Sequence, residues 1–559
     1  MKKNTIRLLA LLLCGVMLFA IAACSKDEKK DDTSNAGTAS SNSGTSNQPA
    51  SPSDTMEAAP TIAAPGAQTS PDTPNLPKEG QVSVRDTLSI AVSGDSGTLL
   101  PNGMTPGFAS VANQFCEPLW KYTNDGTMVF VLATSIDNID TLVWTVHLRD
   151  DVTFSNGKKF TAKDVMFSID FFKAYVVGQY RELHLEDSRI IDDYTVELHF
   201  DPYPYAMAFA ISSLYMYNEE TFDADEFVTN PIGTGPYVVT EYVMNSHLYM
   251  KARDDYWGGK AMIENLVFRV FNEDAQRVNA IQSGLVDIST IPNQDIDFVS
   301  TLSDYTVDKY YTNSAPNLTY NMNPVSIMNN RDARIAVSHA LNRDAVIKLV
   351  YFDFATLLHN PISTNCIGFE AGIMDDLSPV YSIGYNVDLA REYAEKAGIV
   401  GKDLVAITNG IPAYITTAEI LQDNLKDIGV NLIINNYDAA SYQSVQEDPT
   451  MYDIAISGTA SPSGLAISML TNFVLWYPYR YLDSWPGYSH YIEIGNLGLS
   501  IPDPAARRDI NIELNQIHQD EVIWYGICDQ MAAMAIKKGV VPVFWRGRSA
   551  YYNEWRWDS

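Results

Sequence analysis

The sequence predicts an α/β fold divided into two or three domains. Segments with a period of two and β-branched residues, such as 87–92, alternate with segments of helical periodicity, such as 162–172. This alternation continues through the chain that follows residue 80 and is typical of α/β proteins. That part has about 480 residues, too many for a single hydrophobic core. We find no internal repeat.

The N-terminus has the layout of a secretory signal. Lys2, Lys3 and Arg7 form a positive head, and Leu8–Ala23 is an unbroken run of 16 apolar or small residues. This run is shorter than the roughly 20 residues that cross a bilayer. It ends in Ala-Ala-Cys24 followed by polar residues, which resembles a bacterial lipobox.

We therefore expect residues 1–23 to be a lipoprotein signal peptide and Cys24 to carry a lipid. An ordinary signal peptide with a chance cysteine is the alternative. No later segment is apolar for long enough to span a membrane. The lipid alone would then hold the mature chain on the extracytoplasmic face of the cell membrane.

Residues 24–80 are expected to form a disordered tether after the lipidated cysteine. From residue 25 to residue 80 there is no aromatic side chain, and Ser, Thr, Asn, Asp, Ala, Pro and Gly dominate. Such a composition cannot bury enough apolar surface to offset the entropy of ordering the chain. A flexible chain of this length has a root-mean-square reach of roughly 40 Å.

Composition limits the partners and the disulfides. The chain has 68 acidic and 38 basic residues and a formal net charge of -30, which argues against nucleic acid or anionic lipid as a partner. Without Cys14, which leaves with the signal, and Cys24, the cysteines are Cys116, Cys366 and Cys528. These are too few for a disulfide scaffold. One bridge and three buried thiols both stay open.

Periodicity places the main elements in order along the chain. Strands are expected at 87–92, 144–148, 194–200 and 430–434. Helices are expected at 162–172, 275–283, 332–349, 387–397 and 416–428. Gly398 and Gly429 directly follow the last two helices, where a C-terminal cap favours glycine.

Several motifs occur in one order over the folded chain. They are WTVHLRDDVTFSNG at 144–157, TAKDVMFS at 161–168, GTGPY at 233–237, YWGG at 256–259, DARIAVSHALNR at 332–343, LKDIGV at 425–430 and YD at 452–453. Together they resemble the large solute-binding proteins of ABC importers, the family of oligopeptide-, dipeptide- and nickel-binding proteins. Taken residue by residue, these motifs are turns and helix starts, so they indicate a scaffold and not a substrate.

The resemblance implies a large two-lobed fold of the periplasmic-binding-protein class II, with a hinge and an additional domain. It assigns residues 81–130, 231–318 and 526–559 to lobe I, residues 131–230 to the additional domain of lobe I, and residues 319–525 to lobe II. The two crossings between the lobes would lie near Tyr320–Asn323 and near Asp520–Tyr525.

The same resemblance implies a ligand site between the lobes, formed by two loops. The first follows the strand at 87–92 and contains Thr105 and Gly107; the second contains Thr459 and Ser461. In peptide-binding members the second loop carries an acid that pairs with the free amine of the peptide. Here the first acid after Gly458 is Asp483. Because a buried ammonium group requires a charged partner, anchoring of a free N-terminus is doubtful.

Aromatic residues are frequent between 442 and 485, and Trp476 and Tyr477 are candidate ligand contacts. Packing within the protein is the alternative interpretation of each. Gly94-Asp95-Ser96-Gly97 is similar to a serine protease motif but follows the first strand, with no room upstream for the other members of a triad. No His or Cys pair has the spacing of metal ligands. We therefore expect no catalytic residue, no metal site and no cofactor.

The expected function is that of a monomeric receptor, not an enzyme, which delivers a small solute to ABC permease subunits through hinge closure. Peptide is the first expectation for the solute, and an oligosaccharide or a metal chelate is possible. A chemosensory or surface-interaction lipoprotein on the same fold is the alternative, followed by an extracytoplasmic hydrolase.

Overall fold

The structure is a computed structural model, and the residues that it describes lie within one compact unit, Thr69–Ser559. They are residues 83–101, 109–124, 126–139, 142–175, 187–200, 208–209, 211–312, 314–366, 383–460, 466–475, 482, 485–501, 506–545 and 548–558. No helix among them is long and apolar enough to cross a membrane. The expected signal peptide and tether lie outside the described residues.

The first large sheet is centred on the strand expected at 87–92. Its strands, in spatial order, are β12 (Tyr305–Tyr311), β19 (Cys528–Lys537), β11 (Ile288–Ile291), β1 (Thr87–Val92), β10 (Asn265–Val270), β9 (His247–Ala252) and β8 (Tyr237–Val243), and β14 (Ala355–Leu357) also pairs with β19. β1 runs parallel to both β10 and β11. Because Leu88 and Ile90 are buried, this strand anchors the core below the sheet.

The second sheet is formed by strands that lie between β12 and β19 of the first sheet in sequence. Its strands, in spatial order, are β16 (Asn431–Asn436), β15 (Asp403–Thr408), β17 (Ile454–Ala460), β13 (Ser314–Tyr320) and β18 (Trp524–Gly526). β15 is parallel to β16 and β17, whereas β13 is antiparallel to β17 and β18. This sheet has a separate hydrophobic core, which includes Leu318, Leu404 and Ile454.

Smaller sheets complete the β structure. A four-stranded antiparallel sheet has the order β4 (Ala133–Asp137), β5 (Val143–Leu148), β7 (Thr195–His199) and β6 (Arg189–Asp192), and falls within the expected additional domain. Two further pairs are β2 (Trp120–Tyr122) with β3 (Met128–Phe130), and β20 (Val540–Val541) with β21 (Arg556–Trp557).

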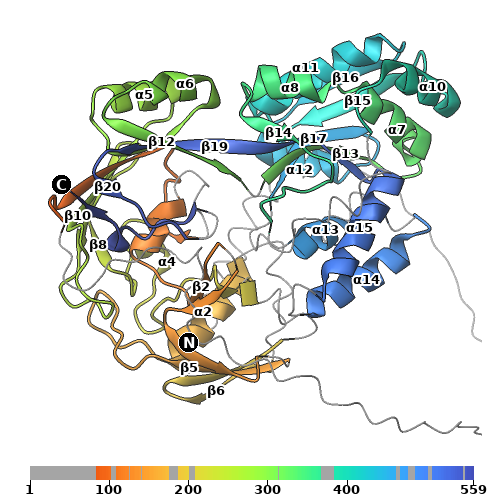
Figure 1. The fold of residues 1–559 in the computed structure, drawn as a ribbon. Helices are drawn as coiled ribbons and strands as arrows, with labels where there is room; N and C mark the ends of the chain where they lie inside the picture. The colour runs from red at the N-terminus through yellow and green to blue at the C-terminus, as the bar shows by residue number, and fades with distance from the viewer. Residues whose placement is uncertain are drawn as a thin grey trace, which may run out of the picture. The chain divides into compact units, whose positions relative to one another are not determined.

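The helices pack on these sheets and on one another (Figure 1). They are α2 (Ala162–Tyr175), α4 (Ala224–Phe227), α5 (Asp274–Gln282), α6 (Ile296–Ser300), α7 (Arg331–Ala340), α8 (Arg343–Val350), α10 (Val387–Ala397), α11 (Pro412–Lys426), α12 (Ala439–Gln446), α13 (Ala466–Leu475), α14 (Tyr488–Ser500) and α15 (Arg508–Glu521). With the parallel strands, they confirm the predicted mixed α/β class.

Two short segments join adjacent strands of the two large sheets directly. One passage joins β12 to β13 through Thr312, and the other joins β18 to β19 at Ile527. The resemblance implies crossings near Tyr320–Asn323 and near Asp520–Tyr525. In the structure, residues 314–320 pair with β17, and residues 524–526 pair with β13. The passages are hydrogen-bonded to their neighbours: Ile527 N–H donates to Pro316 O (2.9 Å) and Thr312 N–H donates to Gln530 O (3.1 Å).

The single helix expected at 332–349 is wrong, because two helices, α7 and α8, occupy this segment. Leu341 has an extended backbone, with φ −69° and ψ 113°. Asn342 then caps α8, since its side chain accepts a hydrogen bond from the Ala345 N–H at 2.9 Å. The cap expected at Gly398 is confirmed, with φ +70°. The cap expected at Gly429 is wrong, because α11 ends at Lys426 and is capped by Asp427, although Gly429 is left-handed too, with φ +75°.

Candidate functional site

The ends of the parallel strands indicate where a ligand site lies in a fold of this kind. In open α/β sheets, ligands bind outside the carboxyl ends of the strands. Those ends are reached after β1 and β11 in the first sheet, and after β15 and β17 in the second. The two loops predicted from the sequence lie at two of these ends: the first follows Val92, and the second is expected from Thr459, although β17 continues to Ala460.

The first loop is held in place by Asp95. Its carboxylate accepts hydrogen bonds from the Gly97 N–H (2.8 Å), the Tyr242 hydroxyl (2.6 Å) and the Asn245 N–H (2.6 Å). Burial and the neighbouring Asp95 carboxylate raise the pKa of Tyr242, which keeps its hydroxyl protonated as the donor. Asp95 therefore fixes the loop to the turn between β8 and β9, in agreement with the loop predicted for the Gly94-Asp95-Ser96-Gly97 motif.

Most of the predicted site residues cannot be placed. Cys24, Thr105, Gly107, Ser461, Trp476 and Tyr477 lie outside the described residues. Thr459 is described only through its backbone, which pairs with Ala315 near the end of β17. The structure thus leaves the ligand contacts as predictions.

Tyr414, which the sequence did not suggest, lies at the end of β17. A Cβ atom on Gly458 would be 2.3 Å from the Tyr414 hydroxyl and 3.3 Å from the Ser314 hydroxyl, so a side chain there would displace the tyrosine hydroxyl. Burial raises the pKa of Tyr414 to about 12, and the hydroxyl is therefore a neutral hydrogen-bonding group. A tyrosine two residues after the first-turn Pro412 was the available signal, but its orientation toward β17 depends on helix packing.

Asp453 is the acidic residue nearest to Gly458 in sequence, and its side chain forms hydrogen bonds within the protein. Asp453 accepts hydrogen bonds from the Ser326 hydroxyl (2.7 Å) and the Val405 N–H (2.9 Å). It thereby joins the start of β17 to β15 and to the segment before α7. The aspartate of the YD motif is consequently a structural residue.

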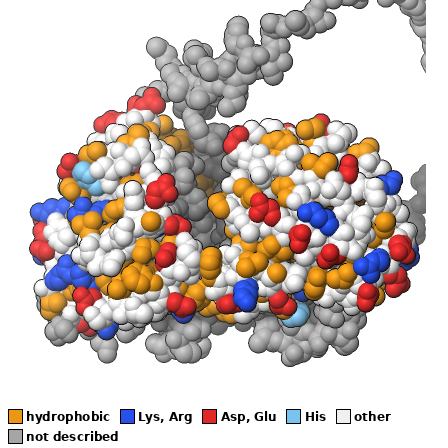
Figure 2. Space-filling model, turned by 90° about the horizontal axis from the view of Figure 1, so that it is seen from above, with side chains coloured by type: hydrophobic (Ala, Val, Ile, Leu, Met, Phe, Trp, Pro, Cys, Tyr) orange, Lys and Arg blue, Asp and Glu red, His pale blue; other side chains and the backbone are white. Residues whose placement is uncertain are grey.

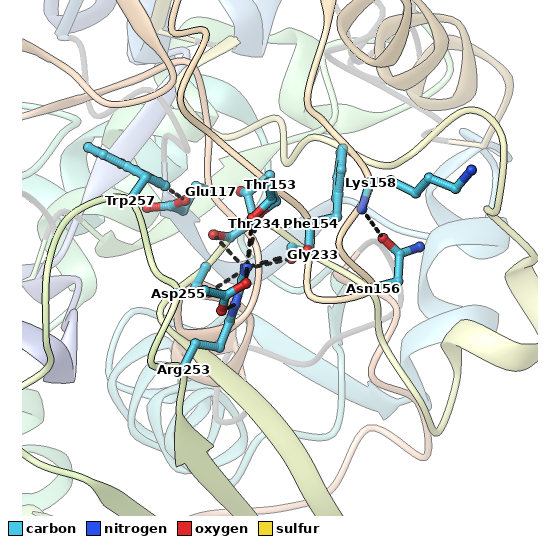
Figure 3. Close-up of polar contacts among 11 residues, drawn as sticks. Glu117, Thr153, Phe154, Asn156, Lys158, Gly233, Thr234, Arg253, Asp255 and Trp257 are labelled. Carbon is cyan, nitrogen blue, oxygen red and sulfur yellow. Dashed lines mark hydrogen bonds and ion pairs between the residues drawn. The ribbon is translucent and has the colours of Figure 1, made fainter.

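Two of the signature motifs meet around Arg253, as Figure 3 shows. Its guanidinium donates to the carbonyl oxygens of Thr153 (3.1 Å) and Phe154 (3.3 Å), which belong to the WTVHLRDDVTFSNG motif. It also donates to the carbonyls of Gly233, Thr234 and Gly235, at 3.3 to 3.5 Å, and is paired with Asp255. One buried arginine therefore connects two motifs that are about 80 residues apart in sequence.

Glu117 lies beside the residues around Arg253, and its carboxylate is also hydrogen-bonded within the protein (Figure 3). It is 2% exposed, and its carboxylate accepts hydrogen bonds from Tyr256 Oη (2.6 Å) and Trp257 Nε1 (3.0 Å). Burial raises the pKa of Glu117, whereas these hydrogen bonds lower it. The YWGG motif thus serves to satisfy a buried acid, which confirms the interpretation of the motifs as scaffold.

The described residues offer few groups for metal binding or thiol chemistry. Within these ranges there is no group of three or more His, Cys, Asp or Glu side chains that could hold a metal ion. Cys116, Cys366 and Cys528 are buried free thiols.

On the face in Figure 2, acidic side chains are scattered among hydrophobic and basic ones.

Known proteins with similar sequences were found for most of the folded chain. The nickel-binding periplasmic protein of Escherichia coli is 25% identical over 399 residues, covering 65% of this chain and 73% of that protein. The dipeptide-binding protein of Escherichia coli is 26% identical over 345 residues, covering 55% of this chain and 63% of that protein.

Solved structures show the same fold. The oligopeptide-binding protein AppA from Bacillus subtilis, in complex with a nonapeptide, has a TM-score of 0.71 at 17% identity, covering 86% of this chain and 100% of that one. NikA from Brucella suis, in complex with Fe(III)-EDTA, has a TM-score of 0.72 at 21% identity, covering 84% of this chain and 100% of that one. These likenesses confirm the predicted periplasmic-binding-protein fold.

Residues 127–478 match the profile of the bacterial extracellular solute-binding proteins, family 5, middle region. This match spans more than half of the chain and includes the motifs gathered around Arg253. The chain therefore belongs to the family 5 extracellular solute-binding proteins of ABC transporters, which bind solutes and are not enzymes.

Proposed function

We propose that this protein is a lipid-anchored receptor that captures a peptide outside the cytoplasm and delivers it to the permease of an ABC importer. Membership of family 5 over residues 127–478 carries the proposal. The fold shared with AppA, whose structure holds a nonapeptide, and the likeness to a dipeptide-binding protein support peptide as the solute.

Closure about the two passages is the proposed mechanism. We propose that lobe I comprises residues 81–130, 231–318 and 526–559, with the additional domain at 131–230, and that lobe II comprises residues 319–525. Solute would bind between the lobes at Thr105, Gly107, Thr459, Ser461, Trp476 and Tyr477. Binding would favour the closed form, which then docks on the permease.

A metal chelate is the second candidate solute. Two observations favour it: the similarity to a nickel-binding protein and the shared fold with NikA, whose structure holds Fe(III)-EDTA. The absence of an acid in the sequence between Gly458 and Asp483 weakens the case for a peptide held by its free amine.

Native mass spectrometry of the purified protein, followed by thermal unfolding with candidate solutes, tests the proposal. At 100 times its dissociation constant, a solute stabilises the native state by roughly 2.7 kcal/mol. We expect N-acetylated peptides to stabilise nearly as well as free peptides, or peptides to fail altogether, because the sequence has no acid between Gly458 and Asp483 that could pair with the amine. Stabilisation by free peptides that is lost on acetylation would contradict this expectation, and stabilisation by chelates alone would select the second candidate.

The lipid anchor needs a separate test. We expect Cys24→Ala to abolish incorporation of radiolabelled palmitate, with Cys116→Ala as the matched control that retains it. Label in the Cys24→Ala protein would refute the anchor.

A further inference from the structure

Arg343, the first residue of α8, is a buried cation that no carboxylate balances among the described residues. The residue is 6% exposed. Within the described ranges, no Asp or Glu oxygen lies within 4.0 Å of its guanidinium nitrogens. The guanidinium donates instead to the carbonyl oxygens of Leu358, Gly526 (3.0 Å) and Ile383 (3.3 Å). These three bonds use three of its five N–H groups.

The guanidinium lies at the wall of a pocket next to the second passage between the sheets. The pocket has about 390 Å³ of empty space, including its open mouth. Its lining residues, which define the Arg343 pocket, are Arg343, Leu358, His359, Asn360, Pro361, Ile383, His518, Gln519, Val522, Trp524, Tyr525 and Gly526. Arg343 carries a positive charge, and none of these lining residues is acidic.

Two hydrogen bonds fix the walls of the pocket. Trp524 Nε1–H donates to Pro361 O (2.8 Å) and Gln519 Nε2–H donates to His359 O (2.6 Å). The Tyr525 ring lies under the guanidinium, with the Cζ atom of Arg343 4.7 Å from the ring centroid. The pocket is therefore formed before any ligand arrives, which lowers the ordering cost of binding.

Arg343 and Gln519 describe the ligand. Two N–H groups of Arg343 donate to none of these three carbonyls, and a carboxylate matches the planar fork of a guanidinium best. Gln519 is 6% exposed, and its Oε1 has no hydrogen-bond donor among the described residues, so it needs a donor. A carboxylate with a neighbouring N–H group, or a carboxylate with an ordered water, suits both residues.

We propose that the Arg343 pocket binds a carboxylate, which Arg343 holds and which His359 attracts from the rim. Partial burial and the charge of Arg343 lower the pKa of His359, and a bound anion would oppose the second of these effects. The carboxylate comes either from a small free anion or from the end of the transported solute. Only the latter source rests on the proposed function.

Binding of ¹³C-labelled formate to the full-length chain, followed by NMR line broadening at constant ionic strength, tests the site. We expect saturable binding to the wild type, at least tenfold weaker binding to Arg343→Lys, and at least threefold weaker binding to His359→Ala. His490→Ala is the matched control, because His490 is exposed and pairs with Glu513 outside the pocket. If Arg343→Lys fails to fold, His359→Ala decides, because its side chain is at the rim and makes no hydrogen bond with the described residues. Unsaturable binding, or equal binding by wild type and His359→Ala, would overturn the proposal.

A second arm distinguishes the sources of the carboxylate. Peptides with a free C-terminus and their C-terminal amides are compared, each with and without formate. A tenfold loss on amidation, together with competition by formate, assigns the carboxylate to the solute; equal affinities without competition assign it to a free anion. If no peptide binds, the proposal of a peptide solute fails. The formate experiment still tests whether the Arg343 pocket binds a carboxylate.

Discussion

At the scale of single residues, Gly235 allows two segments that are distant in sequence to approach closely, because glycine has no side chain. A Cβ atom on Gly235 would lie 2.7 Å from the carbonyl carbon of Phe115 and 2.8 Å from the Gln114 oxygen. The Gly235 N–H also donates to Phe115 O at 3.0 Å. The GTGPY motif is thus pressed against the backbone before β2, and backbone atoms cannot move aside as a side chain can.

We expect Gly235→Ala to lower the free energy of unfolding by roughly 1–3 kcal/mol, because the methyl group must displace backbone. Urea unfolding measures the change. Gly384→Ala is the matched control, since a Cβ atom there meets nothing within 4 Å. Equal stability of the two variants would contradict the close approach.

His339 is a second residue whose surroundings have a measurable effect. Burial is the main cause that lowers its pKa, whereas its hydrogen bond to Gly384 O (2.8 Å) raises it. The folded state therefore favours the neutral imidazole more than the unfolded state does. As the pH falls through the unfolded value of about 6.5, the unfolded chain takes up the proton first, and stability is lost.

Replacing His339 by Asn should consequently reduce the loss of stability between about pH 7 and pH 5. Urea unfolding at several pH values gives the slope. The same substitution at His490, which is 58% exposed in its side chain, is the control. An unchanged slope in His339→Asn would show that other groups cause the acid sensitivity.

At the scale of elements, the boundary between α7 and α8 depends on one cap. Asn342 accepts from the Ala345 N–H, and its own N–H donates to Asn424 Oδ1 at 3.0 Å. The cap therefore ends one helix, starts the next, and joins both to α11. It also determines the direction of Arg343, the residue that follows.

Asn342→Ala should lower the free energy of unfolding by about 1 kcal/mol, since the first turn of α8 loses its side-chain acceptor. Asn342→Asp keeps an acceptor and should retain most of the stability. Urea unfolding compares them. If Asp is as harmful as Ala, the cap is not the cause.

The same elements show what could be predicted from the sequence. The strand at 87–92 and the helix at 387–397 match β1 and α10 residue for residue, because a period and a clear boundary coincide there. The break at Asn342 was missed because the apolar period continues across it. The position of Tyr414 over Gly458 could not be predicted, since it depends on how α11 is rotated against β17. The motifs at 144–157, 233–237 and 256–259 make structural contacts, as expected, with Arg253 and Glu117.

At the scale of the whole molecule, the predicted tether and the folded unit should be separable. Residues 25–80 have no aromatic side chain, whereas the described residues bury large cores. Deleting residues 25–80 should leave solute affinity unchanged, as measured by thermal unfolding with the solute. A large loss of affinity would show that this segment contributes to binding.

The two passages between the large sheets limit how these sheets can move. They are neighbours within one ribbon, since β12 pairs with β19 on one side and β13 pairs with β18 on the other. A ribbon of two strands bends and twists more easily than it shears, so sliding of one sheet along the other would break the hydrogen bonds of Thr312 and Ile527. Hydrogen exchange at the amides of these two residues therefore distinguishes the two motions. Slow exchange at both amides during solute binding would indicate bending alone, whereas faster exchange would indicate shear.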